Sequence, residues 1–112
     1  RLLQRNGLSF ADFDLFEIHE AFAAQVLCTL AAFESATYCR ERLGLGAPLG
    51  AIDRDKLNIA GGSLAIGHPF AATGARMIAG AARLLKDTGG GRVLVTACAA
   101  GGMGVAAIIE RR

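Results

Sequence analysis

Two apolar runs near the C-terminus, joined by glycine-rich chain, constrain the fold of this sequence more than any other feature. Residues 92–98 are β-branched and apolar, which is typical of a strand covered on both faces, and residues 105–109 repeat this character. The glycines between the two runs favour a turn. The pattern therefore predicts a β-hairpin, with other elements packed over both faces of its first strand.

The segments upstream alternate between strand and helix patterns. Residues 13–18 alternate apolar with acidic side chains and predict a strand, whereas residues 21–43 predict one long, largely buried helix. The apolar positions of this helix recur at helical spacing: Phe22, Val26, Leu30, Phe33 and Thr37. Residues 44–53 are typical of a surface loop. Residues 1–7 are typical of the last turns of a helix that ends at a glycine.

A second helix is predicted between Pro69 and the glycines at 89–91. One apolar stripe is expected to face the core, and its small residues imply close packing. The stripe comprises Ala75, Ile78, Ala79, Ala82 and Leu85, and the opposite face carries Arg76, Arg83 and Asp87. The order strand, helix, loop, helix, strand, strand predicts one α/β layered domain without internal repeats.

Composition excludes several classes of protein. Hydrophobic residues make up 53% and charged residues 20% of the 112 residues, which favours one folded domain over a disordered chain. The net charge of +2 comes from interspersed signs, so nucleic acid is a poor candidate partner. Charged residues such as Arg76 interrupt the longest alanine-rich run, so no membrane span is predicted. Three irregularly spaced cysteines give no disulfide framework and favour a reducing compartment.

The residues with candidate chemistry lie in glycine-rich segments. His68 sits between Gly67 and Pro69, where a rigid neighbour can present the imidazole as a general base or an oxyanion donor. Cys98 ends a predicted strand, where a tuned thiol could exchange protons with a substrate. His19 follows the first strand and is placed to point at a ligand from the edge of the sheet. The alternatives are structural histidines and a small buried cysteine.

Other residues are weaker candidates. Glu20 is interpreted as structural, because the helix dipole favours an acidic residue in the first turn. Cys28 and Cys39 are interpreted as core residues of the long helix. Closely spaced Cys or His pairs are lacking, so no zinc site is predicted. The run from Cys98 to Gly104 does not match a dinucleotide fingerprint, since a strand pattern follows its glycines.

At these residues the sequence resembles the C-terminal part of thiolases, over nearly its whole length. Four blocks of that family occur in order: His19-Glu20-Ala21-Phe22, an Asn-x-x-Gly-Gly-x-x-x-x-Gly-His-Pro block from Asn58 to Pro69, Thr73-Gly74-Ala75-Arg76, and a cysteine-plus-glycine loop from Cys98 to Gly104. Position 19 is histidine, where other members have asparagine. In this respect the sequence resembles the branch of the family that includes the β-subunits of fatty-acid oxidation complexes. The resemblance implies a thiolase-like layered α/β fold, with a mixed sheet and packed helices, over residues 1–112.

The resemblance also implies an acetyl-CoA C-acyltransferase that cleaves 3-ketoacyl-CoA through an acyl-thioester on a cysteine. Coenzyme A would be a co-substrate, with no metal and no bound cofactor. His68 would activate the nucleophilic cysteine and contribute to an oxyanion hole. Cys98 would move protons at the acetyl carbon or the incoming thiol, and His19 would hold a water or donate to the thioester oxygen. The backbone N–H of Ala100 would help form an oxyanion hole, where many relatives have a glycine. The residues expected to contact substrate are Phe70 and Gly101.

The nucleophile motif of the family has no counterpart among the three cysteines, and the family's domain begins with a strand upstream of Arg1. We therefore expect a fragment of a longer enzyme, inactive alone and marginally folded, with a gap in its sheet. The resemblance implies a cytoplasmic parent (mitochondrial in a eukaryote) that is at least dimeric and can pair with a hydratase/dehydrogenase subunit. Two alternatives stay open: a ketoacyl synthase-like condensing enzyme, against which Cys98 argues, and a non-catalytic thiolase-like protein that binds CoA or lipid or serves as a scaffold.

Overall fold

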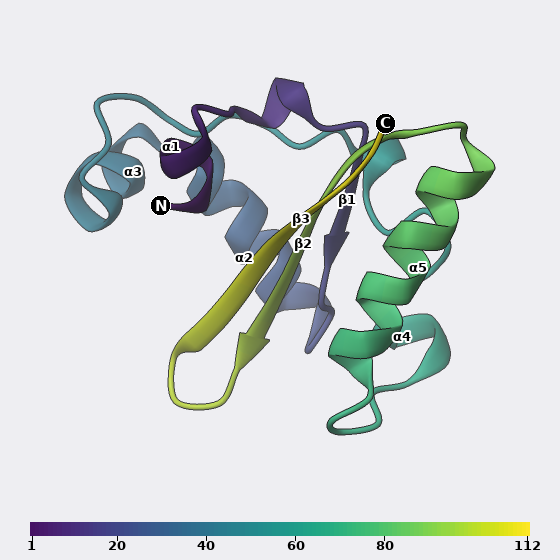
Figure 1. Ribbon diagram of the computed structural model, residues 1–112. Helices are drawn as coiled ribbons and strands as arrows, with labels where there is room; N and C mark the ends of the chain where they lie inside the picture. The colour runs from purple at the N-terminus through teal and green to yellow at the C-terminus, as the bar shows by residue number, and fades with distance from the viewer.

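The computed structural model describes residues 1–112 and is built around a three-stranded mixed sheet (Figure 1). The strands are β1 (Leu15–Ile18), β2 (Gly91–Ala99) and β3 (Met103–Arg111), in the order β1-β2-β3. β1 pairs with β2 in parallel, and β2 pairs with β3 antiparallel. The predicted hairpin is confirmed, and both of its strands are longer than predicted. The three strands are adjacent, and each neighbouring pair is hydrogen-bonded.

The sheet is covered on both faces, as the apolar sequence of β2 predicts. α2 (Ala23–Glu34) packs on one face and α5 (Thr73–Asp87) on the other (Figure 1). The core on the α2 face comprises Phe10, Phe13, Phe16, Ile18, Val26, Leu30, Ile52 and Leu94. The core on the α5 face comprises Met77, Ala81, Leu85, Val93 and Val95. Successive residues of β2 thus alternate between the two cores, and the α/β layered prediction is confirmed.

Short helices occupy the connections. α1 (Leu2–Asn6) ends at Gly7, whose φ of 64° is a left-handed conformation that glycine adopts without strain. Single 3₁₀ turns, η1 and η2, span Phe10–Asp12 and Arg54–Lys56, and α4 (Ser63–Ile66) leads into the loop that carries His68. None of the helices combines the length and the apolar character that crossing a bilayer requires.

The helix predicted over residues 21–43 is in fact two helices. Ser35 has an extended backbone, and α3 (Ala36–Leu43) begins after it. The Oγ of Ser35 accepts a hydrogen bond from the backbone N–H of Tyr38 at 3.2 Å, so this serine caps α3 instead of continuing α2. The predicted stripe is therefore correct only in its middle: Val26 and Leu30 are buried, Phe33 is half-buried, and Phe22 and Thr37 are exposed.

The two cysteines of this segment lie in different environments. Cys39 on α3 is fully buried, and its Sγ lies 3.5 Å from the carbonyl oxygens of Ala32 and Phe33, so the core interpretation is confirmed for it. Cys28 on α2 is exposed, so the core interpretation is wrong for it. Cys28 lies two positions from the buried Val26, a rotation of about 200° around the helix axis, which turns it away from the sheet.

The core-facing stripe of α5 also differs from the prediction. Met77, Ala81 and Leu85 face the sheet with Thr73, at intervals of four residues. Among the predicted stripe residues only Leu85 is buried, and Ala75, Ile78, Ala79 and Ala82 are exposed. α5 is apolar on two neighbouring faces, so periodicity alone selected the wrong one. Arg76 does not face solvent like Arg83 and Asp87, because it is half-buried beside the site described next.

Candidate active site

The fold brings the three predicted catalytic residues to one edge of the sheet. Because β1 and β2 are parallel, their carboxyl ends meet at the same edge. His19 directly follows β1, and its backbone N–H donates to the carbonyl oxygen of Thr96 at 2.8 Å. Cys98 is the penultimate residue of β2. α5 returns to the start of β2 through a short turn, so its first turn and the preceding His68 loop lie at this edge too.

A cavity of about 540 Å³ lies between these residues. The side chains or backbone that line it belong to His19, Ala21, His68, Phe70, Ala71, Cys98, Ala99 and Ala100. The rings of His19 and His68 have their centroids 4.3 Å apart. The structure thus brings together five of the six predicted site residues. The sixth, Gly101, lies one residue further along the hairpin turn, where its φ of 78° suits a glycine, and does not line the cavity.

The backbone around His68 is specialised. Gly67 has φ 91° and ψ 172°, a conformation that essentially only glycine adopts. Ala71 has φ 64°, which costs about 1–2 kcal/mol for a residue with a Cβ atom. Strain of this kind persists where the surrounding structure fixes the chain, and it is common at functional sites. The loop therefore holds His68 in a defined position at the cavity.

A threonine fixes the tautomer of His68. His68 Nδ1 lies 2.6 Å from the Oγ1 of Thr73, a buried residue of α5. Thr73 Oγ1 donates its proton to the carbonyl oxygen of Pro69 at 3.2 Å, so it accepts a hydrogen bond from His68 Nδ1–H. The Nε2 atom of the neutral ring then carries a free lone pair. In this tautomer, Nε2 is the atom of His68 that can accept a proton.

His19 is more deeply buried than His68, with 4% of its surface exposed. Burial lowers the pKa of His19 below its ordinary value of 6.5, and the charges of His68 and Arg76 lower it further, against the opposing effect of Glu20. The folded protein therefore keeps this ring neutral at neutral pH. Its Nδ1 atom lies 3.1 Å from the Oγ of Ser63.

Cys98 presents an exposed thiol, unlike the small buried cysteine that the alternative interpretation expected. Its Sγ lies 3.8 Å from the Oε1 of Gln25. Gln25 Nε2 donates to Thr29 Oγ1 at 3.1 Å, and Thr29 Oγ1 donates to the carbonyl oxygen of Gln25 at 2.9 Å. Because the threonine proton is used in this way, the amide of Gln25 turns its oxygen toward Cys98 and can accept the S–H.

Two polar residues that the sequence analysis did not place at the site hold the His19 segment. Asn58 has φ 50°, and its side chain bonds to both the N–H and the C=O of Ile18, at 2.8 and 2.9 Å. Asn58 Nδ2 also donates to Glu20 Oε1 at 2.8 Å, while Glu20 Oε2 accepts from the N–H of Leu64 at 2.9 Å. Glu20 is thus structural, but it caps α4 rather than the first turn of α2. The sequence signal is an asparagine three residues before the first glycine of Gly61-Gly62, since asparagine tolerates positive φ.

Gly62 tests this anchor, because a Cβ atom there would overlap the carboxylate of Glu20. We expect Gly62→Ala to displace Glu20 and to lower the free energy of unfolding by about 1–3 kcal/mol. Gly80→Ala on α5 is the matched control, since a Cβ there meets open space, and it should gain about 0.5–1 kcal/mol. Urea unfolding of the unmodified chain and of both variants measures these free energies. If Gly62→Ala were as stable as the unmodified chain, Glu20 would not be held as described.

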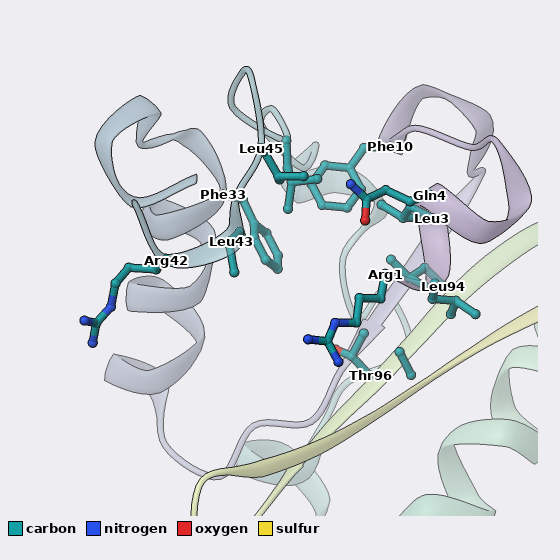
Figure 2. A pocket seen from close by; sticks show the side chains of 13 residues that line it. Arg1, Leu3, Gln4, Phe10, Phe33, Arg42, Leu43, Leu45, Leu94 and Thr96 are labelled. Carbon is teal, nitrogen blue, oxygen red and sulfur yellow. The ribbon is translucent and has the colours of Figure 1, made fainter. Parts of the chain in front are cut away.

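A second cavity, of about 370 Å³, lies on the α2 side of the sheet (Figure 2). Phe10, Phe33, Leu43, Leu45 and Leu94 contribute to its apolar wall, and Arg1 and Arg42 are its only charged lining residues. Its lining contains no histidine, cysteine or carboxylate, so it offers no group for acid or base chemistry at neutral pH. No group of three or more His, Cys, Asp or Glu residues is arranged to hold a metal ion.

Residues 1–111 match the sequence pattern of the thiolase C-terminal domain. The chain is 55% identical over 108 residues to a 3-ketoacyl-CoA thiolase of Aeromonas salmonicida, a match that covers 96% of this chain and 25% of that protein. It is 56% identical over 108 residues to a 3-ketoacyl-CoA thiolase of Colwellia psychrerythraea, with the same coverage of 96% and 25%. The chain therefore spans about a quarter of the length of these curated relatives.

Solved structures show the same similarity. Human mitochondrial 3-ketoacyl-CoA thiolase superposes with a TM-score of 0.74 at 34% identity, over 98% of this chain and 24% of that one. Peroxisomal 3-ketoacyl-CoA thiolase of Saccharomyces cerevisiae superposes with a TM-score of 0.72 at 40% identity, over 99% of this chain and 26% of that one. The yeast protein is described as a five-layered αβαβα structure built from two core domains of identical topology.

Proposed function

This chain belongs to the thiolase family as a C-terminal domain, and we propose that it contributes the acid and base residues of an enzyme that cleaves 3-ketoacyl-CoA with coenzyme A. The observation that carries the proposal is the shared cavity of two histidines and a thiol, in which His68 has a free Nε2 lone pair. An acyl transfer through a cysteine needs a base for the nucleophile and an acid for the leaving carbon. His68 and Cys98 have the chemistry for these two tasks.

In the first half-reaction, His68 Nε2 takes the proton of a nucleophilic cysteine, which lies outside this chain, and the thiolate attacks the keto carbon of the substrate. The bond between the keto carbon and the α-carbon then breaks. Its electron pair leaves with acetyl-CoA as an enolate, and the Cys98 thiol protonates the α-carbon. In the second half-reaction, the Cys98 thiolate takes the proton of coenzyme A, whose sulfur attacks the acyl-cysteine. The departing cysteine recovers its proton from His68.

Negative charge develops on oxygen in both half-reactions, and donors at fixed positions lower its energy. We assign this task to the neutral ring of His19 and to the backbone N–H of Ala100, both of which line the cavity. Ala100 stands in the hairpin turn two residues after Cys98, so it offers its N–H close to the thiol. Phe70 is 86% exposed, with its ring centroid 5.0 Å from that of His68, and we assign it and the neighbouring turn at Gly101 to substrate contact.

We further propose that the reaction belongs to the degradative oxidation of fatty acids in the cytoplasm, in a homo-oligomer that can associate with a hydratase/dehydrogenase subunit. Support comes from the names of the bacterial relatives and from the histidine at position 19, which resembles the β-subunit branch. Substrates would be acyl-CoA and coenzyme A.

The proposal is tested with a chimera in which this chain replaces the matching quarter of the Aeromonas salmonicida relative. We expect the chimera to cleave acetoacetyl-CoA or a longer 3-ketoacyl-CoA and to form an acyl-enzyme that mass spectrometry detects. The isolated chain should do neither. A folded chimera that is neither acylated nor active would contradict the proposal and favour the non-catalytic alternative, whereas condensation without cleavage would favour the condensing enzyme.

A further inference from the structure

A polar network adjoins His19 through residues that do not line the cavity, and the proposed mechanism does not use it. Ser63, at the start of α4, is 7% exposed. Its Oγ has two polar neighbours: His19 Nδ1 at 3.1 Å and Arg76 Nη2 at 3.4 Å. Arg76 comes from α5, so three separate segments of the chain meet at one hydroxyl.

The protons of this network can be assigned by counting donors and acceptors. A guanidinium group has donors only, so Arg76 donates to Ser63 Oγ. The hydroxyl proton of Ser63 is then directed to His19 Nδ1, its remaining polar neighbour. A neutral imidazole carries one proton, and with Nδ1 as acceptor that proton is on Nε2. His19 therefore has the opposite tautomer to His68, whose Nδ1 donates to Thr73.

The charge of Arg76 also acts on a buried acidic residue, Glu17. The side chain of Glu17 on β1 is 5% exposed. Burial raises the pKa of Glu17, and the charge of Arg76 opposes this increase. Arg76 is half-buried, its Nη2 atom bonds to Ser63 Oγ, and its Nε atom has no hydrogen-bond partner. The charged and titratable groups that act on His19 are thus Arg76, His68 and Glu20.

We propose that Ser63, oriented by Arg76, is a positioning residue that fixes His19 as the Nε2–H tautomer, so that His19 acts as a neutral hydrogen-bond donor while His68 acts as the base. The consequence for catalysis rests on the proposed function, because a donor matters only if a carbonyl oxygen binds in the cavity. The tautomer itself is a property of this chain and can be measured without substrate.

The first experiment is nitrogen NMR of the chain labelled with ¹⁵N-histidine. The sequence has only two histidines, so His68→Gln assigns both spectra. We expect His19 to show a protonated Nε2 and an unprotonated Nδ1, and Ser63→Ala to shift His19 toward the other tautomer. Arg76→Met should produce part of this shift, and Arg83→Met, an exposed arginine on the same helix, should produce none. A protonated Nδ1 on His19 in the unmodified chain would overturn the proposal.

The second experiment is kinetic and does not require the isolated chain to fold. In the active chimera, Ser63→Ala should lower kcat about 10- to 100-fold with little change in KM, less than the 10²- to 10³-fold loss typical when an oxyanion donor itself is removed. Ser63→Thr, which keeps a hydroxyl, should restore most of kcat. Equal kcat for Ser63→Ala and the unmodified chimera would overturn the proposal. A chimera without activity whose His19 still carries its proton on Nε2 would instead contradict the proposed function and leave the tautomer assignment standing.

Discussion

Replacing His68 by alanine should lower the rate of the first acyl transfer in the chimera by about 10²- to 10⁴-fold at neutral pH. The imidazole has a free Nε2 lone pair because Thr73 holds its Nδ1–H, and we propose it as the base that forms the nucleophilic thiolate. Without it, the thiol ionises only at its own pKa, which is about 8.5 for an unperturbed cysteine. Acylation measured by rapid quench and mass spectrometry should therefore recover in part as the pH rises toward 9.

The pH dependence distinguishes a lost base from a damaged fold. A variant that simply unfolds loses acylation at every pH, whereas a variant that lacks the base gains rate as hydroxide ionises the nucleophile. Thr73→Val is a useful companion, because it keeps the imidazole and removes the hydroxyl that fixes its tautomer. We expect its acylation rate at neutral pH to lie between those of the unmodified chimera and of His68→Ala. An unchanged acylation rate in His68→Ala at neutral pH would remove His68 from the mechanism.

Cys98→Ser should lower thiolysis by a similar factor of about 10²- to 10⁴-fold. The substitution keeps the shape of the side chain, but a hydroxyl cannot form the anion that must take a proton from coenzyme A. The exchange of the methyl protons of acetyl-CoA with deuterated solvent, followed by NMR, should disappear as well, since this exchange needs proton transfer at the α-carbon.

Cys28→Ser provides the matched control, because Cys28 is also an exposed cysteine but lies on α2 and does not line the cavity. We expect normal thiolysis and normal proton exchange in this variant. Full turnover in Cys98→Ser would show that another group moves the protons, and equal losses in both variants would indicate a general effect of thiol removal.

The local part of the fold could be predicted from the sequence. The β-branched run of β2 and the glycines after it predicted the hairpin, because strand propensity and turn chemistry act over a few residues. The break at Ser35 was missed, since serine is tolerated within helices and its capping bond depends on the backbone that it adopts. The buried face of α5 was also missed, because alanines on two neighbouring faces give periodicity no basis for choosing between them.

In the candidate site, too, some residues could be predicted from the sequence and others could not. His19, His68 and Cys98 were found because histidine and cysteine are rare in this chain and occur beside glycines and strand ends. Ser63, Thr73 and Asn58 were not assigned roles, and Glu20 was interpreted as structural without its partner Asn58. Their roles arise from hydrogen bonds between segments up to 44 residues apart, and these depend on how β1, α4 and α5 pack together. Sequence patterns report residue types and spacing, and they do not report which hydroxyl faces which ring.

The central claim is that both imidazoles and the Cys98 thiol face one cavity, and site-selective alkylation tests it most directly. In a Cys28→Ser chain, Cys98 is the one exposed cysteine, because Cys39 is buried. Alkylation with iodoacetamide should then shift the ¹⁵N-histidine signals of both His19 and His68, while alkylation of Cys28 in a Cys98→Ser chain should shift neither. Unchanged signals of both rings after modification of Cys98 would contradict the account.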